Sequence, residues 1–282
     1  FGNEYLYNMR AVAEWEGYTE NDSFFNPMPF MHNFNMVCCS GPVLLVGGAI
    51  AITPMMDPPT ILSVLTNQKP TFMVLGPAVV KLAPALKKLD FSHVKGIYAT
   101  HGGKKITELL GIPAYHMFGM TEGVIMLTSQ SDPQEVQDNM VGVPVSSHDK
   151  VKLFKIGTEE EITEEGVEGE CAFEGPYTIH GYYDAAERNA QTFTSTGMYR
   201  SGDLMLFRDI GGKRYYQFRG RTKDVVDRAG EKVNSDEVEL MVSRHPAITA
   251  TAVVGMPDKV YGERVCAFIT LRDGMTAPNV AE

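Results

Sequence analysis

Apolar residues recur along the first 140 positions with two different periods, one typical of helices and one typical of strands. Helical spacing runs through residues 5–15, 34–46, 58–65 and 78–89. Short apolar runs predict strands at residues 24–30, 49–53, 71–75, 96–100 and 114–117. Two prolines are expected to stop the first of these strands. Because the two kinds of segment follow one another in turn, this region predicts an α/β fold, a mostly parallel sheet with flanking helices.

The pattern changes after Asn139. Short alternating segments separated by turns predict strands at residues 141–145, 151–156, 170–173, 204–207 and 214–218. Helical spacing then covers residues 236–243, and strand character covers residues 250–256 and 265–271. We therefore predict three parts: the α/β part of a large domain (1–140), a β-rich lobe of that domain (141–222) and the start of a small α+β domain (223–282).

The last two strands of the predicted lobe flank the turn sequence Asp209-Ile-Gly-Gly212, which is typical of a β-hairpin. Asp203 comes just before this hairpin, and Arg221 comes just after it. A carboxylate can accept hydrogen bonds from vicinal hydroxyls and a guanidinium can donate them, so the pair suits a polyhydroxylated ligand. The alternative is a surface hairpin that ends in solvated charges.

Polar residues and glycines occupy the predicted ends of three strands: His32-Asn33, His101-Gly-Gly103 and Met117 to Glu122. Parallel sheets bind ligands beyond the carboxyl ends of their strands, so these segments predict one shared crevice. Thr121 can bind a phosphate oxygen, and Glu122 can ligate Mg²⁺. The alternatives are a helix cap at Thr121-Glu122 and a plain turn at Gly102-Gly103.

Composition narrows the classes of function. The 282 residues carry a net charge of −10, which argues against nucleic-acid binding. No apolar run is long enough to cross a membrane. The four cysteines fit neither a zinc site nor a disulfide framework, so we expect reduced thiols and a cytoplasmic location.

Four motifs carry a resemblance to a known family: Phe118-Gly-Met-Thr-Glu122, Tyr199-Arg-Ser-Gly-Asp203, Gly220-Arg-Thr-Lys-Asp224 and Gly230-Glu-Lys232. They resemble the acyl-adenylate-forming (AMP-binding) superfamily of acyl-CoA synthetases and nonribosomal-peptide adenylation domains. Stand-alone aryl-acid AMP ligases of siderophore biosynthesis are the most similar subfamily. The resemblance implies an adenylate-forming fold, ATP and AMP as nucleotides, and Mg²⁺ as the metal.

The resemblance also implies roles for individual residues. Asp203 would hold the ribose hydroxyls with help from Arg221, and Glu122 would coordinate the metal. The other residues expected to contact the nucleotide are Gly102, Gly103, Met117, Phe118, Gly119 and Thr121. Many family members have Tyr where this chain has Phe118, and aryl-acid ligases commonly have Phe, so this departure favours the subfamily.

The aromatic acid would lie beside Asn33, which in aryl-acid ligases binds the 2-hydroxyl or the carboxylate. Phe34, Gly102 and Ile125 would form the walls of its pocket. The position of Cys38 holds Ser in dihydroxybenzoate ligases and Cys in salicylate ligases, which favours salicylate, although Cys38 can also be a small buried apolar residue. His32 would border the entry route of the acceptor thiol, and a buried structural histidine is the alternative.

The third set of roles concerns the C-terminal part. Lys223 matches the hinge about which a small domain rotates between two half-reactions. Gly230 and Lys232 would then form part of the tunnel for a phosphopantetheine or CoA thiol. The partners implied are a small aromatic carboxylic acid and an aryl carrier protein.

The resemblance covers the chain but only the middle half of a family member. The upstream phosphate loop and the downstream catalytic lysine of the family have no match here, so we expect a fragment with little or no adenylation activity. The expected function of the parent is an aryl-acid AMP ligase for salicylate or 2,3-dihydroxybenzoate. The alternatives are an aromatic acyl-CoA ligase, of the benzoate or coumarate type, and a truncated nucleotide-binding module without turnover.

Overall fold

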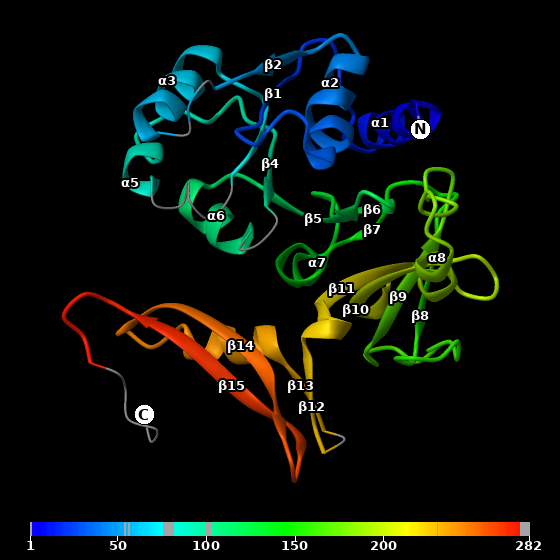
Figure 1. Ribbon diagram of the computed structural model, residues 1–282. Coiled ribbons are helices and arrows are strands. Elements are labelled where there is room, and N and C mark those ends of the chain that lie inside the picture. The colour runs from blue at the N-terminus through cyan, green and yellow to red at the C-terminus, as the bar shows by residue number, and fades with distance from the viewer. Residues whose placement is uncertain are drawn as a thin grey trace.

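The computed structural model describes residues 2–53, 55, 57–75, 82–99, 103–229 and 231–276. These residues form three sheets with flanking helices (Figure 1). Within these ranges, no helix combines the length and the apolar character that crossing a lipid bilayer requires.

The largest sheet has seven strands. In spatial order they are β2 (Ala49–Ala51), β1 (Ser23–Phe25), β3 (Phe72–Val74), β4 (Gly96–Ala99), β5 (Ala114–Met120), β6 (Gly123–Leu127) and β7 (Val143–Pro144). Neighbours run parallel from β2 to β5, and the last two pairs run antiparallel. The predicted α/β fold with a mostly parallel sheet is confirmed.

Helices cover both faces of the parallel strands (Figure 1). One side holds α1 (Gly2–Glu16) and α2 (Gly41–Leu45), and the other holds α3 (Pro58–Gln68), α5 (Ala83–Leu86) and α6 (Gly103–Leu110). Successive strand residues alternate between the two cores, as the period of a strand requires. Phe24 packs in the core with α1 and α2, whereas Phe25 packs with α3 and α6.

The second sheet contains the predicted hairpin. Its strands lie in the order β11 (Lys213–Arg221), β10 (Tyr199–Ile210), β9 (Gly169–Glu174) and β8 (Lys150–Phe154), all antiparallel. Two short helices, α7 (Gln134–Asn139) and α8 (Ala186–Thr192), lie in the connections before β7 and before β10. The three predicted domain ranges stay predictions. Within the predicted lobe, β7 hydrogen-bonds to β6 and so belongs to the largest sheet.

A turn of 3₁₀ helix at Thr222–Asp224 leads from β11 into the third sheet. This sheet has the order β13 (Glu231–Asn234), β12 (Val225–Arg228), β15 (Gly262–Leu271) and β14 (Ile248–Asp258), and α9 (Ser235–Val242) precedes β14. The helix and the two strands predicted after residue 235 are therefore present.

The structure gives a finer description of two predicted elements. The strand predicted over residues 24–30 ends at Phe25, because Asn26 turns the chain by accepting the Met28 N–H on its side chain and prolines follow. The helix predicted over residues 34–46 is a π-helical segment, Asn35–Ser40, that continues into α2. Part of the helix predicted over residues 78–89 lies outside the described residues.

Candidate active site

Asp203 and Arg221 lie directly opposite one another on β10 and β11. The Nε atom of Arg221 donates a hydrogen bond to Oδ1 of Asp203 across 3.2 Å. The adjacent Gly202 and Gly220 have φ angles of 71° and 132°, which L-residues rarely adopt. Glycine at both positions therefore allows the backbone that pairs the two charges.

The two charges have different environments. The side chain of Asp203 is 3% exposed, whereas that of Arg221 is 50% exposed. Burial raises the pKa of Asp203 to about 6, Arg221 opposes this rise, and Asp224 and Glu122 add to it. The Glu122 carboxylate therefore lies within electrostatic range of Asp203, as a shared site requires.

Glu122 lies in the turn between β5 and β6, not at the start of a helix, so the helix-cap alternative is wrong. Its Oε1 atom accepts a hydrogen bond of 2.8 Å from the hydroxyl of Tyr182, which also lies 2.9 Å from the hydroxyl of Tyr199. The Glu122 carbonyl accepts the N–H of Ile179 at 2.8 Å. The loop that carries Tyr182 thus holds Glu122 by both backbone and side chain.

The loop is itself tied to α8. Asn189 accepts the Tyr182 N–H on its Oδ1 at 2.7 Å and donates to the Tyr182 carbonyl at 2.9 Å. The guanidinium of Arg188 lies 3.9 Å from the centre of the Tyr182 ring, a cation–π contact. These contacts limit the positions that the Tyr182 hydroxyl can take. Because this hydroxyl donates to Glu122, they also limit the positions of the Glu122 carboxylate.

A small cavity of about 70 Å³ brings together most of the residues predicted for the acid pocket. Its lining consists of His32, Asn33, Phe34, Val37, Cys38, Met117, Gly119, Met120, Thr121 and Ile125. Two of the three predicted strand-end segments therefore meet here. His101 and Gly102 of the third segment lie outside the described residues, and Gly103 is the first residue of α6.

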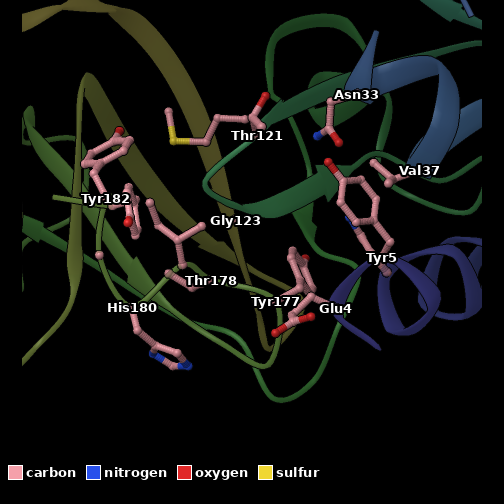
Figure 2. A pocket seen from close by; sticks show the side chains of 15 residues that line it. Glu4, Tyr5, Asn33, Val37, Thr121, Gly123, Tyr177, Thr178, His180 and Tyr182 are labelled. Carbon is pink, nitrogen blue, oxygen red and sulfur yellow. The ribbon is translucent and has the colours of Figure 1, made fainter. Parts of the chain in front are cut away.

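A larger cavity of about 530 Å³ adjoins the small one and shares Asn33, Val37, Met120 and Thr121 with it (Figure 2). Aromatic side chains of α1 and of the Tyr177–Tyr183 loop line its other walls (Figure 2). Among the described residues, the buried Oδ1 of Asn33 and the buried Oγ1 of Thr178 have no hydrogen-bond partner. Unpaired buried acceptors are costly, so both atoms suit contact with a polar ligand.

Asp203 and Arg221 line neither cavity. They are connected to the cavities through β5, because the ring of Phe118 stacks on Phe218 of β11 at 6.1 Å between centroids. Phe118 precedes Gly119 of the small cavity by one residue. Neighbouring residues of β5 thus contact the strand that carries Arg221 and line the small cavity.

The remaining predicted residues have mixed positions. His32 is exposed, and its Nδ1 accepts the Phe34 N–H at 3.2 Å, so the alternative of a buried structural histidine is wrong. Lys223 lies in the 3₁₀ turn that joins the second and third sheets. Lys232 lies on β13 opposite Asp227, and Gly230 lies outside the described residues.

The structure adds residues that we did not predict for the site. Tyr182, in the Gly181-Tyr-Tyr183 segment, hydrogen-bonds to Glu122. Tyr177 accepts the Ile125 N–H at 2.9 Å and so holds a wall of the small cavity. Both tyrosines are about 50 or 60 residues from their partners, and no local pattern reveals such contacts.

The residues present fit a magnesium ion that is held mainly by phosphates. In the described part of the chain, no three acidic, histidine or cysteine side chains gather into a metal site. Mg²⁺ is commonly bound by one or two carboxylates together with substrate phosphates and water. Glu122 alone can serve as such a ligand, because Tyr182 occupies its Oε1 and leaves the other oxygen available.

Comparison with known proteins agrees with this geometry. The AMP-binding enzyme family matches residues 3–183, and the AMP-binding enzyme C-terminal domain matches residues 237–282. The protein belongs to the AMP-binding enzyme family. The predicted superfamily is therefore confirmed.

Several individual proteins are similar to this chain over nearly its whole length. The chain is 35% identical over 280 residues to pyochelin synthase PchD of Pseudomonas aeruginosa, covering 95% of this chain and 50% of the relative. It is 31% identical over 293 residues to 2,3-dihydroxybenzoate-AMP ligase of Bacillus subtilis, with 99% and 52% covered. The chain thus spans about half the length of these relatives. ATP-bound MatB from Rhodopseudomonas palustris has the same fold, with a TM-score of 0.85, 23% identity, and 98% and 55% covered.

The first prediction concerns the pH dependence of Asp203. Its pKa rises from an ordinary 3.8 to about 6 on folding, so the native state binds this proton more tightly. The carboxyl therefore adds stability below about pH 4 that is lost as the pH rises through 6, about 2–3 kcal/mol in all. We expect Asp203→Asn to remove this dependence in denaturant unfolding between pH 4 and 7.5.

Burial also raises the pKa of Glu16 to about 7 and that of Asp149 to about 6. Both groups are present in wild type and in the variant, so their effects on the stability profile cancel in the comparison. Asp209→Asn is the matched control, because this exposed carboxylate pairs with Arg214 and its pKa is lowered. It should leave the profile above pH 5 unchanged. Parallel profiles for wild type and Asp203→Asn would contradict the assignment.

The second prediction concerns Tyr182. Tyr182→Phe removes the hydroxyl that donates to Glu122 and leaves the ring in place. We expect the free energy of unfolding to fall by about 1.5–3 kcal/mol, the usual range for a hydrogen bond to a charged group. Tyr183→Phe is the control, because the adjacent Tyr183 is 100% exposed. Equal stabilities of the two variants would show that the Tyr182 hydroxyl does not hold Glu122.

Proposed function

We propose that this chain carries the acid-binding and nucleotide-binding residues of an aryl-acid AMP ligase. The ligase would activate salicylate or 2,3-dihydroxybenzoate with ATP and transfer the acyl group to a phosphopantetheine thiol of an aryl carrier protein. One observation carries the proposal: the unpaired, buried Oδ1 of Asn33 lines a cavity whose wall includes Thr121, next to Glu122. The similarity to a dihydroxybenzoate-AMP ligase supports it.

The chemistry of the small cavity supports an aryl acid as the substrate. Among the residues that the structure describes, its lining contains no carboxylate that could pair with the ammonium group of an amino acid. The unpaired Oδ1 of Asn33 is an acceptor, and the 2-hydroxyl of salicylate or dihydroxybenzoate is a donor. Phe34 and Ile125 offer apolar walls for the ring. Burial raises the pKa of the Cys38 thiol well above its usual range, so the thiol stays neutral beside the ring.

Asp203 and Arg221 suit the ribose of the nucleotide. With a pKa of about 6, the Asp203 carboxyl is ionised at neutral pH and can accept hydrogen bonds from both ribose hydroxyls. The half-exposed Arg221 keeps donors that Asp203 does not use. Gly103, Met117, Phe118, Gly119 and Thr121 would contact the base and the phosphates.

The first half-reaction joins the acid to AMP. A carboxylate oxygen of the acid attacks the α-phosphorus of ATP, and pyrophosphate leaves with the electron pair of the broken P–O bond. Catalysis of such a step is mostly positioning and charge stabilisation. Mg²⁺ bound at Glu122 would offset negative charge on the phosphates. Asn33 and the cavity walls would fix the direction of the acid, and Tyr182 would fix Glu122.

In the second half-reaction, the acceptor thiol gives up its proton to water, its sulfur attacks the acyl carbon, and AMP leaves with the electron pair of the broken C–O bond. His32 is exposed at the edge of the small cavity, where it can border the entry route of the thiol. Rotation at Lys223 would bring Gly230 and Lys232 toward the site. CoA in place of the carrier protein would use the same chemistry, and comparing the two acceptors separates the possibilities.

The third prediction tests ligand binding. We expect this chain to bind a non-hydrolysable salicyl-adenylate analogue in titration calorimetry, because it has both the small cavity beside Asn33 and the Asp203–Arg221 pair. Asp203→Asn should weaken binding at least ten-fold, since it loses charge-assisted hydrogen bonds to the ribose. Asp209→Asn, at the far end of the same hairpin, should bind like wild type. Binding by Asp203→Asn that equals wild type would contradict the assigned ribose site.

The fourth prediction concerns the choice of acid. A serine hydroxyl is a stronger hydrogen-bond partner than a thiol, so Cys38→Ser should favour a second ring hydroxyl. We expect the ratio of affinities for the 2,3-dihydroxybenzoyl and salicyl analogues to rise about five-fold, one hydrogen bond's worth. Cys39→Ser is the control, because Cys39 is equally buried but does not line the small cavity. An equal ratio in both variants would remove Cys38 from the specificity determinants.

A further inference from the structure

The side chain of Asn234 connects the third sheet to the second. Its Oδ1 accepts the backbone N–H groups of Asp236 and Glu237, at 2.9 and 3.4 Å, and so caps the N-terminus of α9. Its Nδ2 donates to the carbonyl oxygen of Arg219 on β11. One amide therefore fixes the start of α9 and ties it to the strand that carries Arg221.

Arg219 makes a second connection between the same two elements. Its Nε donates to Glu168, just before β9, at 2.7 Å. Its Nη2 donates to Glu237, in the first turn of α9, at 2.5 Å. The guanidinium thus bridges Glu168, which precedes β9 of the second sheet, and Glu237, which follows the 3₁₀ turn that contains Lys223.

Gly220 provides the room for this arrangement. Its φ angle of 132° is rarely adopted by an L-residue. A Cβ atom at this position would lie 2.8 Å from the Nδ2 atom of Asn234. Any side chain here would therefore push Asn234 and the start of α9 away from β11.

We propose that Arg219, Asn234 and Glu237 form a clasp that holds residues 225–276 in their present orientation against the second sheet. The inference rests on the proposed function, in which the segment that carries Lys232 rotates at Lys223. The three are positioning residues, because they touch neither the acid cavity nor the Asp203 carboxylate. Rotation at Lys223 requires the clasp to open.

The strength of the contacts suits a clasp that opens. The side chains of Arg219, Glu168 and Glu237 are 29%, 43% and 58% exposed, and ion pairs at such sites contribute little each. Salt screens them further. Together with the Asn234 bond they favour one orientation, but each can be replaced by contacts with water.

The fifth prediction measures the orientation directly. Spin labels at Lys213→Cys, the first residue of β11, and at Val260→Cys, in the β14–β15 turn, report the distance between the two sheets. Both positions are exposed, and Cys266→Ser removes the one cysteine that is not buried. We expect a single narrow distance distribution at low salt by pulsed electron paramagnetic resonance.

Glu237→Gln and Arg219→Gln should each broaden or shift more than half of this distribution, and the double variant should do no more than either alone. Adding 1 M salt should broaden the wild-type distribution but not that of Glu237→Gln. Asp273→Asn, which removes an exposed carboxylate elsewhere in residues 225–276, should match wild type. Thermal unfolding midpoints should stay constant across the set, since only the orientation changes.

Distributions of Glu237→Gln and Arg219→Gln that superimpose on wild type would overturn the clasp. A wild-type distribution that is already broad at low salt would overturn it as well. Neither result bears on binding of the salicyl-adenylate analogue, which tests the proposed function by itself. Failure of that binding would in turn leave the distance measurement valid.

Discussion

The antiparallel register that sets Asp203 opposite Arg221 is the constraint on which the rest of this structure depends. A shift of one residue would turn every side chain of the hairpin to the opposite face. The same strand β11 carries Phe218, which stacks on Phe118 of β5, and Arg219, which reaches α9. One strand pairing therefore connects the Asp203–Arg221 pair, the largest sheet and the C-terminal part.

The negative charges of Asp203 and Glu122 repel one another, which makes ionisation of both carboxyls costly. Asp203 is buried, and Glu122 adds to the cost of its ionisation. The protein offsets part of this cost with Arg221 at Asp203 and with the Tyr182 hydroxyl at Glu122. A ligand that brings hydroxyl donors and a bound cation would offset the rest, which is the chemistry of a magnesium nucleotide. The electrostatics of these residues thus agree with the family to which the chain belongs.

The sequence predicted much of the fold because the relevant signals are local. Alternation of apolar residues reports the faces of a strand, so the parallel strands and the β10–β11 hairpin could be placed from periodicity and turn residues. Boundaries were less accurate, as at the strand that ends at Phe25. In the site, Asn33, Cys38 and Ile125 were identified by resemblance to a family, and the structure brings them to one cavity. Tyr182 was missed as a partner of Glu122, because its role depends on a loop 60 residues away.

By itself, the sequence determined the α/β class, the hairpin and the chemical types of residue available at the strand ends. Tertiary structure alone decided which of those residues meet. Hydrogen bonds such as Tyr182 to Glu122 and Asn234 to Arg219 form between segments that periodicity treats as independent. The physical reason is that the spacing of apolar residues along the sequence reports only the local backbone conformation. Contacts between distant segments are selected by the packing of whole sheets and helices.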